Sequence, residues 1–222
     1  MLVCRDERKT ALAAICRCRQ DRRIMGSPFS GVLLAAGRSR RMGSDKALLD
    51  RDGAPLWQRQ RAVLAAAGAR EIFLSARPEQ SWAAAAPGFA AVLHDAMPDG
   101  GPLVGITAAI ERQSHPHLAV LAVDLPRLPA AWFAILLAKC GSGVGCVGRR
   151  GDRFEPLAAV YPREMKWLAW EHLARGEFAL QPLIGAAIGQ GRLQVTDVQP
   201  DQEAWFENWN EPGLPPAASA SA

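Results

Sequence analysis

Residues 31–46 combine an apolar run with a glycine-containing loop rich in positive charge. The run breaks at Gly37, and the residues that follow include four cations and one acid, in the order Arg38, Arg40, Arg41, Asp45 and Lys46. Backbone N–H groups in a glycine-rich turn can surround phosphate oxygens, and cations neutralise their charge. The pattern indicates a site for a polyanion, with a nucleoside triphosphate as the leading candidate. Composition alone is equally consistent with a basic surface loop.

Two common phosphate-binding motifs do not match this loop. The P-loop requires four residues between its glycines and then Gly-Lys-Ser/Thr. Here five residues separate Gly37 from Gly43, and a Ser-Asp pair intervenes before Lys46. The dinucleotide fingerprint G-x-G-x-x-G does not follow the apolar run either. The loop is therefore a motif of another kind.

Two aspartates follow apolar runs and could hold a divalent cation. Asp124 comes directly after the most apolar run, residues 118–123. Capping the next helix is a poor alternative for Asp124, because that helix is expected to begin only at residue 130. Asp95 ends a shorter run, but a proline and a glycine follow closely, so a turn-forming role competes. Mg²⁺ takes one or two protein carboxylates together with substrate phosphates, and this pair would suit it.

Lys46 is the expected phosphate-binding and catalytic cation, because it can reach a triphosphate as a flexible point charge. In a reaction that cleaves a triphosphate, we expect Arg41 to stabilise the loop or the departing pyrophosphate. The alternative for Lys46 is a solvated ion pair with Asp45 or Asp50, which contributes little. Such cations act on charge that grows on the leaving phosphate, so they should affect turnover more than binding.

Strands and helices alternate along the chain, which predicts a mostly parallel sheet with helices on both faces. Apolar runs predict strands at residues 31–35, 71–76, 91–94, 118–123, 145–147, 154–161 and 193–198, with 154–161 the candidate for an antiparallel orientation. Helical patterns lie at residues 56–67, 103–112, 130–139, 163–175 and 181–188. The predicted fold is a three-layer, Rossmann-like α/β domain. Right-handed crossovers would bring the strand-end loops to one sheet edge.

Length and composition fit a single domain of this class. The chain has 222 residues, is 49% hydrophobic and carries a net charge of +4, too mild to argue for nucleic acid. Its five cysteines lack the paired C-x-x-C spacing of a zinc site, and their odd number without a secretory signal favours reduced thiols. No apolar run reaches 18 residues. We expect a cytoplasmic protein that binds neither nucleic acid nor a membrane.

The residues around this loop match a longer sequence signature. Residues 34–49 read L-A-A-G-R-S-R-R-M-G-S-D-K-A-L-L, which closely resembles the signature L-A-[GA]-G-x-S-x-R-M-G-x-D-K of the MobA-like nucleotidyltransferases. Further matches follow in the family's order: G-P-L-x-G at 101–105, D-x-P-x-x-P at 124–129, E-P-L-x-A-x-Y at 155–161 and F-x-N-x-N-x-P at 206–212. The first and last of these resemble the molybdenum cofactor guanylyltransferase branch of the family. The resemblance covers roughly residues 29–214.

This resemblance implies a fold of the nucleotide-diphospho-sugar transferase type and a specific reaction. The reaction is transfer of GMP from GTP to Mo-molybdopterin, with release of pyrophosphate and with Mg²⁺ as cofactor. GTP and Mo-molybdopterin would be the small-molecule partners. Proteins that insert or chaperone the molybdenum cofactor would be further partners.

The resemblance also implies roles for individual residues. Nucleotide binding would fall to Leu34, Ala35, Ala36, Gly37, Lys46, Ser75, Asp95, Gly101 and Asp124, with Ser75 at a position where the family often has Asn. Catalysis would fall to Lys46, Arg41 and Asp124, and metal binding to Asp124 and Asp95. The acceptor side would be formed by Glu155, Asn208 and Asn210.

One departure from the family pattern bears on the nucleotide base. Ala36 gives L-A-A-G, as in related cytidylyltransferases, where the guanylyltransferases usually have L-A-G-G. An extra methyl group at a position of close approach can reshape a base pocket. A CTP-dependent molybdopterin cytidylyltransferase is therefore an alternative. A sugar-phosphate nucleotidyltransferase and a non-catalytic nucleotide-binding adaptor are the others.

The ends of the chain look different from the matched region. Residues 1–28 are rich in arginine, and we expect a disordered basic extension, with Met25 as an alternative start. Residues 215–222 are low in complexity, and we expect a disordered tail. The predicted nucleotidyltransferase domain is residues 29–214.

Overall fold

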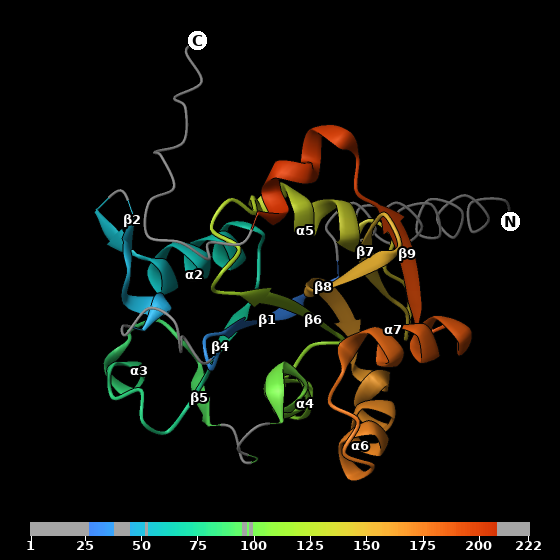
Figure 1. Cartoon of the computed structure of the whole chain (residues 1–222), viewed down its shortest axis with the longest axis horizontal. Helices are drawn as coiled ribbons and strands as arrows, with labels where there is room; N and C mark the ends of the chain where they lie inside the picture. Colours follow the sequence, from blue (N-terminus) through green and yellow to red (C-terminus); the bar gives the residue numbers. More distant parts are fainter. Residues whose placement is uncertain (1–26, 38–44, 52, 95–96, 98–99, 208–222) are drawn as a thin grey trace, which may run out of the picture.

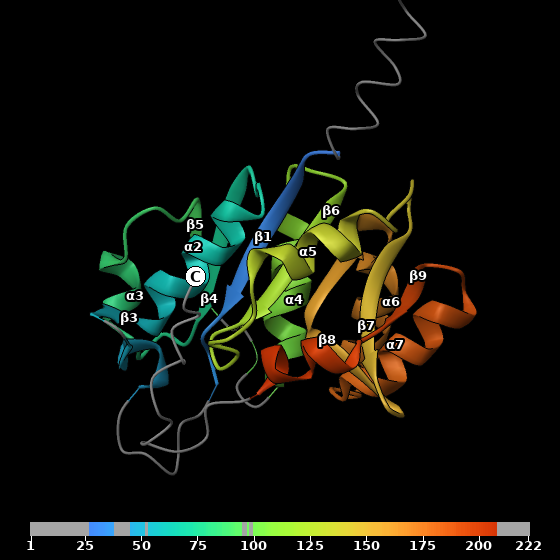
Figure 2. The ribbon, with the colours of Figure 1, turned by 90° about the horizontal axis from the view of Figure 1, so that it is seen from above.

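The structure is a computed structural model that describes residues 27–37, 45–51, 53–94, 97 and 100–207. A seven-stranded sheet in the order β5-β4-β1-β6-β8-β7-β9 runs through its centre (Figure 1). Its strands are β1 Phe29–Leu34, β4 Glu71–Ala76, β5 Ala91–His94, β6 His117–Ala122, β7 Gly145–Arg150, β8 Arg153–Pro162 and β9 Leu193–Asp197. Viewed from above, β5 lies toward one side of the sheet and β9 toward the other (Figure 2).

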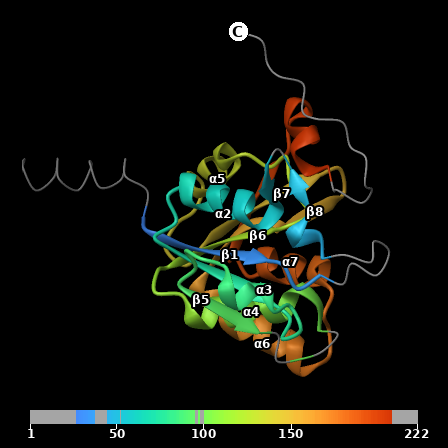
Figure 3. The same ribbon diagram turned by 90° about the vertical axis from the view of Figure 1, so that its left-hand side faces the viewer.

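Helices cover both faces of this sheet. On one face lie α2 Leu56–Ala66 and α5 Ala130–Leu137, and on the other α4 Gly101–Arg112, α6 Lys166–Ala174 and α7 Leu180–Gly189. Figure 3 shows α2 and α5 on one side of the strands and α4 and α6 on the other. The predicted three-layer α/β architecture is therefore confirmed.

The central strands are apolar because both of their faces are covered. β1 and β6 are buried at every residue, as expected of parallel strands between two helical layers. Neighbouring residues of β1 point to opposite faces, so Leu33 packs into the core under α2 and α5 while Val32 packs into the core over α4. The two cores bury large side chains such as Trp132 and Tyr161 completely.

Strand direction determines where the loops gather. β1 pairs in parallel with β4 and β6, β4 pairs in parallel with β5, and β7 pairs in parallel with β9. β8 runs antiparallel to β6 and β7, as considered from the sequence. In the register, Leu34 of β1 lies beside both Ser75 of β4 and Ala122 of β6. The carboxyl ends of these three strands therefore end level with one another, and their loops meet at one edge.

Several boundaries differ from the prediction for physical reasons. β7 continues to Arg150, beyond the predicted end at residue 147, because its polar end pairs with both β8 and β9. The helix predicted at 163–175 begins as a 3-10 turn, η2 Arg163–Met165, before α6. The two-residue strands β2 Asp50–Arg51 and β3 Ala54–Pro55 were not predicted. Three short helices were not predicted either: η1 Lys46–Leu48, α3 Trp82–Ala85 and η3 Pro200–Phe206.

The predicted domain limits remain predictions, since residues 1–26 and 208–222 lie outside the described part of the chain. Within the described residues, no helix has the length and apolar character needed to cross a membrane.

Candidate active site

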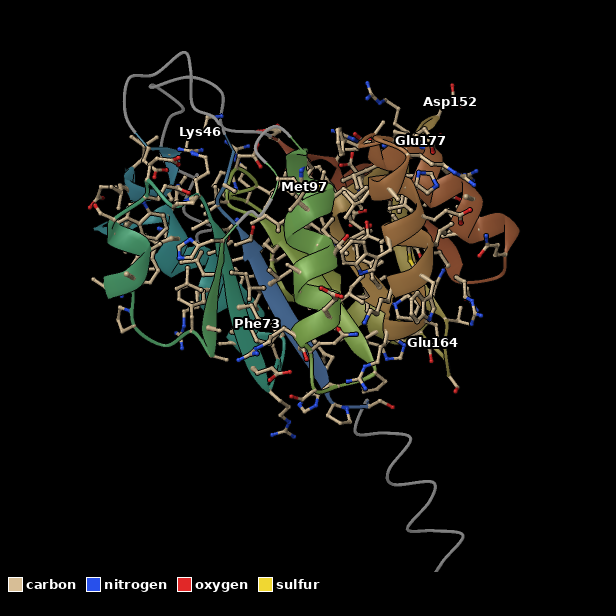
Figure 4. The ribbon with its side chains drawn as sticks, turned by 90° about the horizontal axis from the view of Figure 1, so that it is seen from below. Lys46, Phe73, Met97, Asp152, Glu164 and Glu177 are labelled. Carbon is tan, nitrogen blue, oxygen red and sulfur yellow. The ribbon has the colours of Figure 1, made fainter. Side chains whose placement is uncertain are left out.

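A pocket of about 520 Å³ lies at the edge where β1, β4 and β6 end. Its size is within the range of small-molecule and cofactor sites. Its walls come from the segments after these strands, from the start of α4 and from β8. The lining residues are Leu34, Ala35, Ala36, Gly37, Asp45, Lys46, Ser75, Arg77, Pro78, Glu79, Met97, Gly101, Pro102, Ala122, Val123, Asp124 and Leu157. Figure 4 shows Lys46 and Met97 at the same end of the molecule, near the start of α4.

The segment after β1 forms one wall of the pocket. Its backbone continues the sheet pattern for one more residue, because Ala35 N donates to Ser75 O at 2.8 Å and Val123 N donates to Leu34 O at 3.1 Å. Beyond this point Ala36 is half-buried and Gly37 is exposed. A Cβ placed on Gly37 would meet no atom within 4 Å, so a ligand can approach this backbone closely. All four residues predicted here for nucleotide binding line the pocket.

Lys46 enters the same pocket from the other side of the loop. It is the first residue of η1, and this turn is capped by Asp45, whose Oδ1 accepts a hydrogen bond from Ala47 N at 3.1 Å. Ala47 is completely buried, which holds the turn against the core. The side chain of Lys46 is partly exposed and lines the pocket. The local fold therefore presents an ammonium group at the strand edge.

Asp124 lies two residues beyond the end of β6 and lines the pocket with Lys46. Burial raises the pKa of the Asp124 carboxyl above its ordinary value, and the nearby charge of Lys46 partly opposes this. The remaining upward shift means that the protein only partly compensates the buried negative charge. A hard, doubly charged cation would compensate it further, and carboxylate oxygens are the ligands that Mg²⁺ prefers. Asp124 therefore fits a divalent metal ion.

The described residues contain no group of three or more His, Cys, Asp or Glu side chains that could hold a metal ion. This is compatible with Mg²⁺ in phosphate-transfer sites, where substrate phosphates and water complete the ligand set. The two other acids on the pocket wall are Asp45 and Glu79. Asp45 already caps η1, and the Glu79 side chain is 77% exposed beside Arg77. Asp124 is therefore the best placed described carboxylate for this role.

The pKa of Asp124 gives a stability prediction for Asp124→Asn. Between the ordinary Asp pKa and the raised folded-state value, the folded chain binds a proton that the unfolded chain has lost. Stability therefore falls as pH rises through that window, and the cost persists at neutral pH. Asparagine removes this cost, so we expect the variant without ligands to have a higher Tm than the wild type at pH 7. The difference should shrink as pH is lowered.

Thermal unfolding followed by circular dichroism across this pH range measures the effect. Glu79→Gln is the matched control, since the Glu79 side chain is largely exposed, and its Tm should change little. An Asp124→Asn variant less stable than the wild type at pH 7 would contradict the argument.

The carboxyl end of β4 and the start of α4 close the pocket. Ser75 is buried at 1% exposure, and a Cβ on Gly105 would lie only 2.3 Å from its hydroxyl oxygen. Glycine at position 105 is therefore what lets α4 approach β4 so closely. Gly101 has a φ of +63°, which favours glycine, and it lines the pocket at the first residue of α4. Both Ser75 and Gly101 therefore line the same pocket as Lys46 and Asp124.

Glu155 is not among the pocket residues. It lies in β8, where its Oε1 accepts a hydrogen bond from Arg150 Nε at 2.9 Å. Burial raises the pKa of the Glu155 carboxyl above its ordinary value, and the nearby charge of Arg150 partly opposes this. Leu157, two residues further along β8, does line the pocket. The structure therefore places Glu155 on a pocket-forming strand but not with Lys46 and Asp124.

Four predicted site residues lie outside the described part of the chain: Arg41, Asp95, Asn208 and Asn210. Other residues that line the pocket were not predicted as site residues, among them Arg77, Met97, Pro102 and Leu157. Arg77 follows the end of β4 by one residue, so its place after a predicted parallel strand was an available signal.

Comparison with known proteins decides the family. Residues 31–189, more than half of the chain, match the family described as MobA-like NTP transferase domain. The chain belongs to this family. As a member of the MobA-like NTP transferase family, it carries the family's signature residues 34–37 and 45–46 on the walls of the pocket. The resemblance predicted from the sequence is confirmed.

Two relatives cover most of the chain. A protein of Opitutus terrae named probable molybdenum cofactor guanylyltransferase is 40% identical over 84% of this chain and 92% of its own length. The molybdenum cofactor guanylyltransferase of Pseudomonas putida is 30% identical over 84% of this chain and 95% of its own length.

Solved structures confirm the fold. Molybdopterin-guanine dinucleotide biosynthesis protein A from Archaeoglobus fulgidus has a TM-score of 0.64 at 19% identity, covering 82% of this chain and 93% of that one. A nucleotidyl transferase from Methanothermobacter thermautotroptrophicus has a TM-score of 0.66 at 17% identity, covering 83% of this chain and 93% of that one. At these identities the likeness concerns the fold alone.

Proposed function

We propose that this chain transfers the GMP moiety of GTP to molybdopterin bearing molybdenum and releases pyrophosphate. The observation that carries the proposal is that Lys46 and Asp124 line one pocket at the edge where three parallel strands end. Membership of a nucleotidyltransferase family supports the reaction class. The names of the relatives from Opitutus terrae and Pseudomonas putida support the acceptor and the base.

In this proposal the backbone of residues 34–37 and the buried edge of β4 hold the base and ribose. Lys46 contacts the triphosphate and stabilises the negative charge that develops as pyrophosphate leaves. The acceptor's terminal phosphate oxygen attacks the α-phosphorus, forming a new P–O bond while the bond to the β-phosphate breaks. Alignment of the two phosphates in one pocket lowers the entropic cost of this reaction.

The reaction also needs compensation for the charge of the triphosphate. Mg²⁺, held by Asp124 and in our proposal also by Asp95, would supply that compensation at the α-phosphate when bound. The protein's own contribution is the half-buried carboxylate of Asp124 just beyond the end of β6, with Lys46 lining the same pocket. Arg41 is proposed as the second cation on the departing pyrophosphate. Glu155 of β8, Asn208 and Asn210 are proposed on the acceptor side.

The proposed substrates also suggest where the protein acts. GTP and Mo-molybdopterin are its small-molecule partners, so we place the reaction in the cytoplasm. Proteins that insert or chaperone the molybdenum cofactor are proposed as the partners that receive its product.

A CTP-dependent reaction is the second candidate, and one observation favours it. Ala36, the departure from the guanylyltransferase pattern, is half-buried and lines the pocket, so its methyl group occupies space near the proposed nucleotide. The methyl group changes the shape of the pocket but adds no hydrogen-bonding group. The relatives from Opitutus terrae and Pseudomonas putida are both named as guanylyltransferases, so we favour GTP.

Pyrophosphate release with GTP and with CTP tests both candidates, each measured with and without molybdopterin and Mg²⁺. We expect kcat/KM for GTP to exceed that for CTP by about tenfold or more, the scale of one unpaired polar contact. Release should require the acceptor and the metal ion. A clear preference for CTP would overturn the base assignment, whereas no release with any nucleotide would contradict the enzyme assignment.

A further inference from the structure

The carboxylate of Asp45 is held by side chains from a distant part of the sequence. Its Oδ2 accepts hydrogen bonds from Gln80 Nε2 at 2.7 Å and from Trp82 Nε1 at 2.6 Å. Its Oδ1 accepts the hydrogen bond from the Ala47 backbone that caps η1. Hydrogen bonds from N–H groups to a carboxylate are roughly twice as strong as hydrogen bonds between two neutral groups. Asp45 therefore joins the turn that carries Lys46 to the segment after β4.

Gln80 also bonds to the other side of the same loop. It is 5% exposed, and its Nε2 donates to Ala35 O at 3.0 Å as well as to Asp45. Its Oε1 accepts from Arg77 N at 2.6 Å, so the orientation of the amide follows from its partners. A glutamate at this position could not donate to Ala35 or to Asp45, and would add a like charge. These three contacts therefore require an amide, with both a donor and an acceptor, at position 80.

Arg77 completes the connection. Its Nη1 donates to Ala36 O and to Gly37 O, each at 2.7 Å. The residues from Arg77 to Trp82 thus bond both to the backbone that leaves β1 and to the acid next to Lys46. We call Asp45, Arg77, Gln80 and Trp82 the loop clamp.

Trp82 is itself held in place. Its ring stacks on Trp57 of α2, with ring centroids 6.0 Å apart and an interplanar angle of 23°. Neither Trp82 nor Gln80 lines the pocket, whereas Lys46, next to Asp45 in sequence, does. Trp82 and Gln80 can therefore influence a ligand only through the residues that they hold.

We propose that Gln80 and Trp82 are positioning residues that fix the backbone under Lys46, so that its ammonium group meets a bound triphosphate. A lysine side chain has much rotamer freedom, and an anchored backbone limits what must be ordered when phosphate binds. The inference rests on the proposed function, because it takes Lys46 as the residue that contacts the triphosphate. The inference adds Gln80 and Trp82 as residues that do not line the pocket but on which the contact between Lys46 and the triphosphate depends.

Trp82→Phe tests this proposal, because it removes the indole donor to Asp45 and keeps an aromatic ring against Trp57. The readout is the affinity for Mg²⁺-GTP, measured by calorimetry in wild-type and Lys46→Ala backgrounds as a double-mutant cycle. We expect Lys46→Ala to weaken binding about tenfold and Trp82→Phe about fivefold, a part of what a charge-assisted hydrogen bond contributes. In the Lys46→Ala background, Trp82→Phe should change affinity less than about twofold.

Trp170→Phe is the matched control. It removes an indole hydrogen bond to a carboxylate of the same kind, from Trp170 Nε1 to Glu111 Oε1 at 3.0 Å on the surface of α6 and α4. Its affinity for Mg²⁺-GTP should equal that of the wild type. Gln80→Met is the second variant, with the same expected dependence on Lys46, should Trp82→Phe fail to fold.

The possible outcomes separate this inference from the proposed function. Equal losses for Trp82→Phe with and without Lys46, or no loss at all, would overturn the positioning role. A wild-type chain that binds Mg²⁺-GTP but transfers no GMP would contradict the proposed function only, because the binding cycle still decides the role of the clamp. A wild-type chain that binds no nucleotide would overturn both.

Discussion

Lys46→Ala is expected to lower kcat for GMP transfer by roughly 10²–10³-fold at saturating GTP, the loss seen when one donor to a developing oxyanion is removed. Lys46 lines the same pocket as the strand-end carboxylate of Asp124, close enough for their charges to interact, and in our proposal its charge acts on the leaving pyrophosphate. Because this charge grows during the reaction, the loss of turnover should exceed the loss of nucleotide affinity.

The effect is measured as the initial rate of pyrophosphate release with saturating GTP and molybdopterin. Lys166→Ala is the matched control, since Lys166 lies on α6, contacts Glu111 and does not line the pocket. Its kcat should be that of the wild type. If Lys46→Ala retained turnover within a few-fold of the wild type, Lys46 would have no part in the chemistry.

Asp124→Asn is expected to lower kcat by about 10³-fold, corresponding to about 4 kcal/mol of charge stabilisation in the transition state. Asparagine keeps the shape of the side chain but removes the negative charge that suits a divalent cation. The Mg²⁺ concentration that gives half-maximal activity should also rise. A conformational explanation would require a less stable protein, whereas this variant is expected to be more stable at neutral pH.

Asp152→Asn is the matched control for this substitution. Asp152 is exposed at the turn between β7 and β8, far from Lys46 in Figure 4, and its loss should leave both kcat and the Mg²⁺ requirement unchanged. Full activity of Asp124→Asn at the Mg²⁺ concentration used for the wild type would exclude Asp124 as a metal ligand.

The sequence was sufficient to predict the strands of the sheet and the position of Lys46 and Asp124 at one edge of it. The bounds of β4 and β5 were predicted as observed. Strands that are buried like β4 are largely apolar, because helices cover both of their faces. The parallel direction of β1 and β6 then places the loop of Lys46 and the strand-end Asp124 at one edge. These features depend on patterns that are local in sequence.

The loop clamp could not be predicted in this way. Asp45 is separated by 35 residues from Gln80 and by 37 from Trp82, and neither partner belongs to a recognisable local motif. The two-residue strands β2 and β3 and the four-residue α3 carry too few residues for a periodic pattern. Side-chain hydrogen bonds across such distances follow from the packed fold, so only the structure reveals them.

A crystal structure with a non-hydrolysable GTP analogue and Mg²⁺ tests the central claim most directly. We predict one triphosphate in the pocket at the ends of β1, β4 and β6, with the Lys46 ammonium on its phosphates and the Asp124 carboxylate on the metal ion. A nucleotide bound elsewhere, or one that contacts Lys46 while Asp124 faces away from the phosphates, would contradict the account.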